Sequence, residues 1–337
     1  MNKHWIKIAS IYVGTVIGAG FASGREIIEF FGVYGIKGIW GIVIAGLLFS
    51  LVGSLLLIKI YNKKINGFDE LVLNIFGKRF GFVLDTIMIF SLYTGFSVMV
   101  AGSGAIFKQE LNLSFNIGVI FMIICAFLVF LFSLEGLSFI NSILVPLLII
   151  GIIFITLYVN INGGYNFSNV EGANITKKGN FITSSLLYFG SNSLIIIIVF
   201  SSLLPLIDSK KTAVIGGILG GIILFVLGLS ILTSILVYYN EVFILDIPML
   251  KVCDYVGKHY RKTYAIILWI AMFTTALANG FGFINRISKD KNNIFSTALF
   301  CISTIPLAKI GFSNLVGVLY PISGLIGIMV MIGIFIL

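Results

Sequence analysis

Apolar residues in this chain fall into long runs separated by short groups of charged and turn-forming residues. A transmembrane helix needs about 20 consecutive, mainly apolar residues. We therefore predict an all-α polytopic membrane protein with ten spans, in a single transmembrane domain covering residues 1–337. The spans are expected at residues 5–31, 39–60, 80–107, 115–132, 137–159, 181–207, 212–239, 264–287, 294–310 and 312–337.

Composition strengthens this interpretation. Hydrophobic residues make up 59% of the chain and charged residues only 10%, whereas about a quarter of the residues in a soluble domain carry charge. Ten spans with short connections leave no room for a separate catalytic module, and the chain has no GxSxG or HExxH motif. We therefore expect a protein that is not an enzyme.

The charges bear on topology and partners. The 22 Lys and Arg residues outnumber the 13 Asp and Glu residues, and we interpret the excess as loop basicity that sets orientation. If the N-terminus lies inside, just over half of the basic residues fall on the inner side, and we predict this orientation. We expect a multi-pass protein of a cell membrane, typically the bacterial plasma membrane. The expected partners are the lipid bilayer and a small-molecule substrate, with no nucleic acid, and protein partners stay undetermined. Three scattered cysteines and two histidines suggest no cofactor and no metal site beyond a possible Na⁺ site.

The two halves of the chain resemble each other. A Gly-Leu-Ser segment at residues 136–138 precedes Pro146, and Gly-Phe-Ser at 311–313 precedes Pro321 at the same spacing. Five predicted spans lie within residues 1–160 and five within 181–337, on either side of a polar loop at 160–180. Repeats with an odd number of spans must have opposite orientations in the membrane. The alternative is that Gly, Ser and Pro recur by chance in an apolar chain.

Two spans contain residues that favour interruption of a helix. The first carries four glycines between residues 14 and 24, and the sixth carries a polar, small-residue group at 190–193. Unwound backbone at membrane depth is tolerated where it lines a cavity, and paired interruptions indicate a transporter's binding site. We predict breaks around residues 18–24 and 190–193. The alternative is close helix packing through small residues.

An inverted repeat of five plus five spans with interrupted first and sixth helices resembles the LeuT-type fold of the amino acid, polyamine and organocation (APC) transporter superfamily. The segment from Gly14 to Phe31 is similar to the YkvI-type membrane proteins within it. The resemblance implies a secondary active transporter, a symporter, of a small polar metabolite such as an amino acid, working by alternating access with cation coupling, Na⁺ being favoured over H⁺. The alternative is a ligand-binding sensor or receptor subunit built on a transporter fold.

The resemblance also implies a cation site. Its ligands would be the carbonyls of Gly14 and Ile17 and the hydroxyls of Thr274 and Thr275. Oxygen ligands of this kind suit a hard cation. Alternatively, both threonines hydrogen-bond to carbonyls one turn earlier in their own helix.

Substrate is expected to contact the two predicted breaks. An anionic group would be favoured near the first break, where freed N–H groups and a positive helix end are expected. A third-span tyrosine could add a contact, although such residues more often only pack. The expected substrate-binding residues are Gly18, Ala19, Gly20, Tyr93, Gly190, Ser191 and Asn192.

Ionisable residues within the spans are functional candidates because charge is costly in a bilayer. Arg25 resembles an outer-gate arginine of LeuT-type relatives, although a local ion pair with Glu29, four residues on, is the simpler interpretation. Glu26 could titrate and couple protons. Asp85 is expected to form a membrane-surface ion pair with Lys78 and Arg79 rather than a proton relay.

Overall fold

The computed structural model describes residues 4–131, 137–163, 180–287 and 294–336, and every regular element in these ranges is helical. Seven of its helices are long and apolar enough to cross a membrane, which confirms an all-helical, multi-pass membrane protein. They are α4 (Lys37–Lys63), Gly81–Leu111 within α5 (Phe68–Leu111), Ile143–Asn162 within α7 (Leu137–Asn162), α8 (Phe181–Ser201), α9 (Lys210–Val237), α12 (Lys258–Ile287) and α15 (Phe312–Ile336).

Shorter helices occupy the other predicted spans. The fourth span corresponds to α6 (Phe115–Leu131), and the ninth to α13 (Ile294–Ser303) and α14 (Ile305–Ala308). The count of ten spans and the inverted repeat stay predictions. Most of the expected loop at 160–180 lies outside the described residues, as does Gly136 of the repeat. The remaining short elements are η1 (Gly32–Tyr34), η3 (Leu204–Leu206), α10 (Tyr239–Val242) and α11 (Pro248–Asp254).

The first span is broken within residues 18–24, as the glycine pattern predicts, and the interruption occurs at two points rather than one. It consists of α1 (His4–Val16), α2 (Ala19–Ser23) and α3 (Arg25–Phe30). At the first break Gly18 is extended, and its N–H donates to the Val16 carbonyl at 2.8 Å instead of to the carbonyl one turn back. At the second break Gly24 has φ +80°, a left-handed conformation that residues with a side chain rarely adopt.

The predicted interruption of the sixth span is wrong, because α8 runs without a break from Phe181 to Ser201. The Ser191 and Ser193 hydroxyls donate to carbonyls three residues back within the same helix, at 2.8 and 2.7 Å. Gly190 meets the Gly324 backbone of α15 so closely that a side chain there would collide with the Gly324 carbonyl oxygen. The small residues therefore serve close helix packing, the alternative that the sequence left open.

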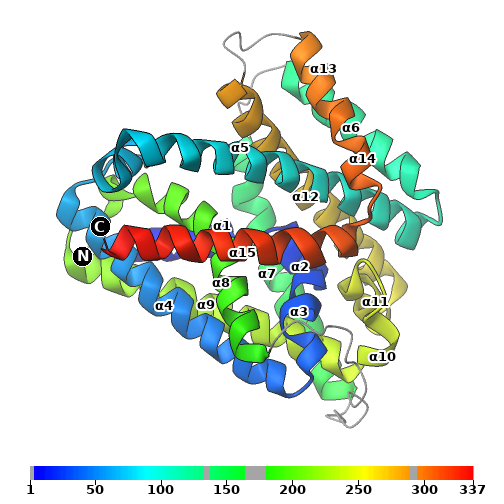
Figure 1. Ribbon diagram of the computed structural model, residues 1–337. Coiled ribbons are helices and arrows are strands. Elements are labelled where there is room, and N and C mark those ends of the chain that lie inside the picture. The colour runs from blue at the N-terminus through cyan, green and yellow to red at the C-terminus, as the bar shows by residue number, and fades with distance from the viewer. Residues whose placement is uncertain (1–3, 132–136, 164–179, 288–293, 337) are drawn as a thin grey trace.

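Glycines also bring together helices from the two halves of the chain. In α9, Gly217 and Gly221 contact Ser54 and Ser50 of α4, and a Cβ at Gly102 of α5 would lie 2.6 Å from the Met272 sulfur of α12. Small residues permit this close approach of backbones within a membrane. The resulting α4–α9 and α5–α12 pairs frame α1 and α8 (Figure 1).

The start of α1 and the end of α15 lie on the same side of the molecule (Figure 1). The His4 imidazole lies 2.8 Å from the Asp208 carboxylate just before α9, and Lys59 near the end of α4 donates to the Ile334 carbonyl in α15. Because Gly217 near the start of α9 contacts Ser54 late in α4, these ends form one face.

The α8–α15 contact yields a stability prediction. Gly324→Ala should lower the free energy of unfolding by about 1–3 kcal/mol, because the added Cβ would collide with the Leu187 carbonyl oxygen. Gly228→Ala in α9 is the matched control, since its Cβ would meet Ile42 at an ordinary 3.7 Å. Thermal unfolding in detergent measures both variants, and equal midpoints would contradict the proposed close contact.

Candidate substrate site

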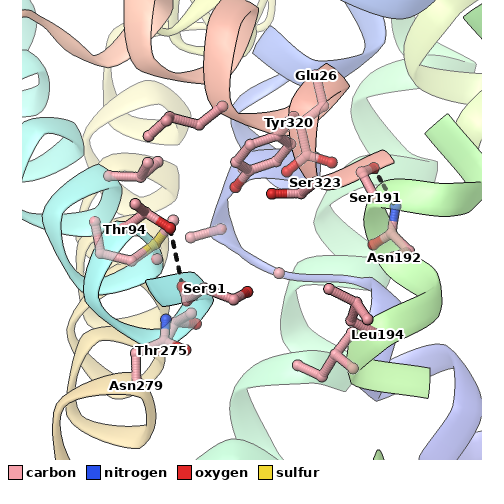
Figure 2. A pocket seen from close by; sticks show the side chains of 18 of the residues that line it. Glu26, Ser91, Thr94, Ser191, Asn192, Leu194, Thr275, Asn279, Tyr320 and Ser323 are labelled. Carbon is pink, nitrogen blue, oxygen red and sulfur yellow. Dashed lines mark hydrogen bonds between the residues drawn. The ribbon is translucent and has the colours of Figure 1, made fainter. Parts of the chain in front are cut away.

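A cavity of about 170 Å³ lies beside the first break of the first span. It is bounded by α1–α3 together with α5, α8, α12 and α15, and Figure 2 shows its polar side chains converging from these helices. Its volume is below the about 300–1,000 Å³ typical of sites for drug-sized ligands, so it suits a small occupant. The lining residues are Thr15, Val16, Gly18, Ala19, Gly20, Glu26, Ser91, Thr94, Gly95, Val98, Met99, Ser191, Asn192, Leu194, Ile195, Thr275, Asn279, Leu319, Tyr320 and Ser323.

Several lining residues were not expected from the sequence. They form pairs three or four residues apart within otherwise apolar helices, a spacing that places both members on one helix face. This pattern was the signal available in the sequence, because a polar face on a membrane helix points toward protein or water. The pairs are Ser91 and Thr94 in α5, Tyr320 and Ser323 in α15, and Thr275 and Asn279 in α12, of which only Thr275 was predicted, as a cation ligand.

Glu26 is the acidic residue of the cavity wall. It lies at the start of α3, only 5% exposed, and accepts a hydrogen bond from the Tyr320 hydroxyl of α15. Its carboxylate folds back against Gly20 of α2, where a Cβ would collide with Glu26 Oε1 and lie 3.2 Å from the Tyr320 hydroxyl. Figure 2 shows Glu26 and Tyr320 side by side, across the cavity from Thr275 and Asn279. The glycine at position 20 thus makes room for the carboxylate.

Arg25 and Glu29 form the local ion pair that their spacing favours. The Arg25 guanidinium also donates to the carbonyls of Phe243 and Leu245, at 2.8 and 3.1 Å, in the segment between α10 and α11. Neither residue lines the cavity. Arg25 therefore ties the C-terminal part of the first span to the segment before α11, and its charge is engaged away from Glu26.

Only one of the four proposed cation ligands lines the cavity. Thr275 lines the cavity, whereas Thr274 is only 2% exposed and, like Gly14 and Ile17, is not among the lining residues. Both threonine hydroxyls donate to the Ala271 carbonyl, at 3.1 Å from Thr274 and 2.8 Å from Thr275. This is the backbone hydrogen bonding that the sequence offered as the alternative. It leaves the oxygen lone pairs of Thr275 free to accept.

The expected substrate contacts divide into two groups. Gly18, Ala19, Gly20, Ser191 and Asn192 line the cavity, and Gly190 does not because it is buried against α15.

Tyr93 is also outside the cavity lining. Its hydroxyl donates to the Ser303 carbonyl at 2.7 Å, and its ring packs against Phe283 and Phe300. The structure thus favours a packing role for Tyr93.

Asp85 forms a surface ion pair, but with a different partner from the one expected. Its carboxylate lies 2.6 Å from the Arg286 guanidinium at the end of α12. The side chains of Lys78 and Arg79 lie outside the described residues. The sequence could not reveal this pairing, because it joins residues that are far apart in the chain.

Solved structures resemble this chain in fold. A mutant of the Eremococcus coleocola manganese transporter matches with a TM-score of 0.59 and 15% identity, over 98% of this chain and 78% of that one. Mhp1, a nucleobase-cation-symport-1 family transporter, matches in its inward-facing conformation with a TM-score of 0.56 and 11% identity, over 95% and 72% of the two chains. At such identities the likeness shows a LeuT-type transporter fold alone.

No protein-family model matches the chain. Two proteins of Bacillus subtilis are similar in sequence. The uncharacterized protein YyaD is 26% identical over 337 residues, covering 96% of this chain and 93% of YyaD. The uncharacterized membrane protein YkvI is 30% identical over 332 residues, covering 96% of this chain and 92% of YkvI. This chain therefore belongs to the YkvI family of membrane proteins.

Proposed function

We propose that this protein is a secondary active transporter that carries a small polar metabolite, such as an amino acid or a related compound, by alternating access. The observation that carries the proposal is the polar cavity beside the doubly broken first span. Freed backbone at membrane depth is stable where it lines a cavity, and such sites bind the substrate in many transporters. The transporter fold of the structural neighbours supports the same function.

Coupling to a cation is part of this proposal. Thr275 and Thr15 both line the cavity and carry hydroxyl oxygens, and hard cations such as Na⁺ prefer oxygen ligands. We propose Na⁺ as the coupling ion at Thr275, with the Gly14 and Ile17 carbonyls as the backbone ligands. The proposal further includes a cell-membrane location with the N-terminus inside, the inverted five-plus-five repeat and membership of the APC superfamily.

The test of transport is uptake of radiolabelled amino acids and related metabolites into proteoliposomes under an imposed sodium or proton gradient. Uptake against a concentration gradient is the expected result. Binding without uptake for every ligand that stabilises the protein would contradict transport and favour a sensor.

Gly20→Leu should abolish uptake. Its side chain would displace the Glu26 carboxylate and fill the space next to the Tyr320 hydroxyl. Gly228→Ala, whose Cβ has ordinary contacts, should transport like the wild type. Initial uptake rates at equal reconstitution levels provide the measurement, and undiminished uptake by Gly20→Leu would count against this cavity as the substrate site.

Thr275→Ala should remove the sodium dependence of ligand binding, because it deletes the hydroxyl that faces the cavity. The Thr274→Ala plus Thr275→Ala double variant should show the same loss, while Thr274→Ala alone should retain most of the dependence, since Thr274 lies away from the cavity. Binding titrations in sodium and in potassium measure the effect. Sodium dependence that persists in the double variant would rule out this cation site.

A further inference from the structure

The cavity carries an unusual balance of charge. Among its lining residues Glu26 is the carboxylic acid, and none of the lining residues is Lys, Arg or His. The adjacent Arg25 directs its guanidinium to Glu29 and to the Phe243 and Leu245 carbonyls. Within the described parts of the chain, no ion pair joins Glu26 to a cationic side chain.

A buried carboxylate without a cationic partner is costly when it is ionised. The cost disappears if a proton neutralises the group or if a cation enters the cavity beside it. An anionic ligand group would instead meet a like charge at close range, which is unfavourable in a site of low dielectric. The charge of the cavity therefore favours a cationic ligand group over an anionic one.

The surroundings of Glu26 also fit an ammonium group. An ammonium has three N–H donors and no acceptor, so it needs several oxygen atoms around it. The carboxylate can supply one acceptor, and the hydroxyl and carboxamide side chains of Ser191, Thr275, Asn279 and Ser323 line the same small cavity. Figure 2 shows Ser323 beside Glu26, and Thr275 and Asn279 on the opposite side of the cavity.

We propose that the cavity binds a small amine-bearing compound whose protonated amino group pairs with Glu26, and that a proton takes the place of the amine when the site is empty. This inference deepens the proposed function, since it names the substrate class of the same site. Amine and proton exclude each other at this carboxylate. The sequence led us to expect an anionic group of the substrate near the first break. In this proposal the anionic group at that place is instead the Glu26 carboxylate of the protein.

The inference predicts a dependence on pH with a definite sign. The groups that interact electrostatically with the Glu26 carboxylate are Tyr320 of α15 and Tyr188 of α8, while Arg25 and Glu29 on its own helix pair with each other. Protonation of Glu26 removes the charge that attracts the ammonium. Amine affinity should therefore fall as the pH is lowered.

The experiment uses purified full-length protein and probes that share one carbon skeleton but differ in charge. Butylamine, pentylamine and hexylamine are compared with the amides and carboxylates of equal chain length, by ligand-induced thermal stabilisation. We expect the amines to stabilise the wild type more than the amides and the carboxylates least. Glu26→Gln, which keeps the shape and an acceptor for Tyr320, should weaken amine binding by about 10- to 100-fold and remove its pH dependence.

Asp85→Asn is the matched control, since it neutralises a carboxylate in an exposed ion pair with Arg286; it should bind amines like the wild type. Glu26→Asp, which restores the charge, should recover part of the amine preference if the glutamine variant folds poorly. Equal stabilisation by all probes, a preference for carboxylates or no stabilisation by any amine would overturn the inference.

The outcome is separable from that of the transport assay. Glu26-dependent amine binding without uptake would leave the inference standing and contradict transport. Uptake of a neutral substrate that is unaffected by Glu26→Gln would support transport and contradict the inference.

Discussion

The structure depends on one constraint, which is that backbone polar groups at membrane depth need partners or a cavity. In the first span the regular helix is interrupted at two points, because Gly18 is extended and Gly24 has φ +80°. The segment between them, Ala19–Ser23, is a single short helical turn with its residues buried. The surrounding helices α5, α8, α12 and α15 accommodate this irregular segment by presenting polar side chains to it, and the cavity results from that arrangement.

The same span also separates two carboxylates with different environments. Glu29 is paired with Arg25, whose Nη1 donates to the Phe243 and Leu245 carbonyls. Glu26, one turn earlier, lies in the cavity wall with a tyrosine hydroxyl as its hydrogen-bond partner. One acid is thus held in a structural network, while the other is available to a proton or a ligand. This difference gives the site its chemical character.

The sequence was sufficient for the class of fold and for the broken first span, because hydrophobic run length and glycine clustering act locally. The sequence was misleading at Gly190, because small residues favour either a helix break or close helix packing. Which of the two occurs depends on the segment that packs against them. Here that segment is the α15 backbone at Gly324. Two other features could not be predicted, because they join helices that are far apart in the chain and a single sequence does not show which helices meet. They are the Asp85–Arg286 pair and the cavity wall formed by Asn279, Tyr320 and Ser323.

The central claim is that a water-accessible polar cavity lies beside the broken first span. Cysteine labelling tests it most directly, in a background in which Cys125, Cys253 and Cys301 are replaced. A cysteine in place of Ser191, which lines the cavity, should react with a small polar thiol reagent, whereas one in place of Ser193, which is fully buried, should not. Equal reactivity at the two positions, or no reaction at Ser191, would contradict the account.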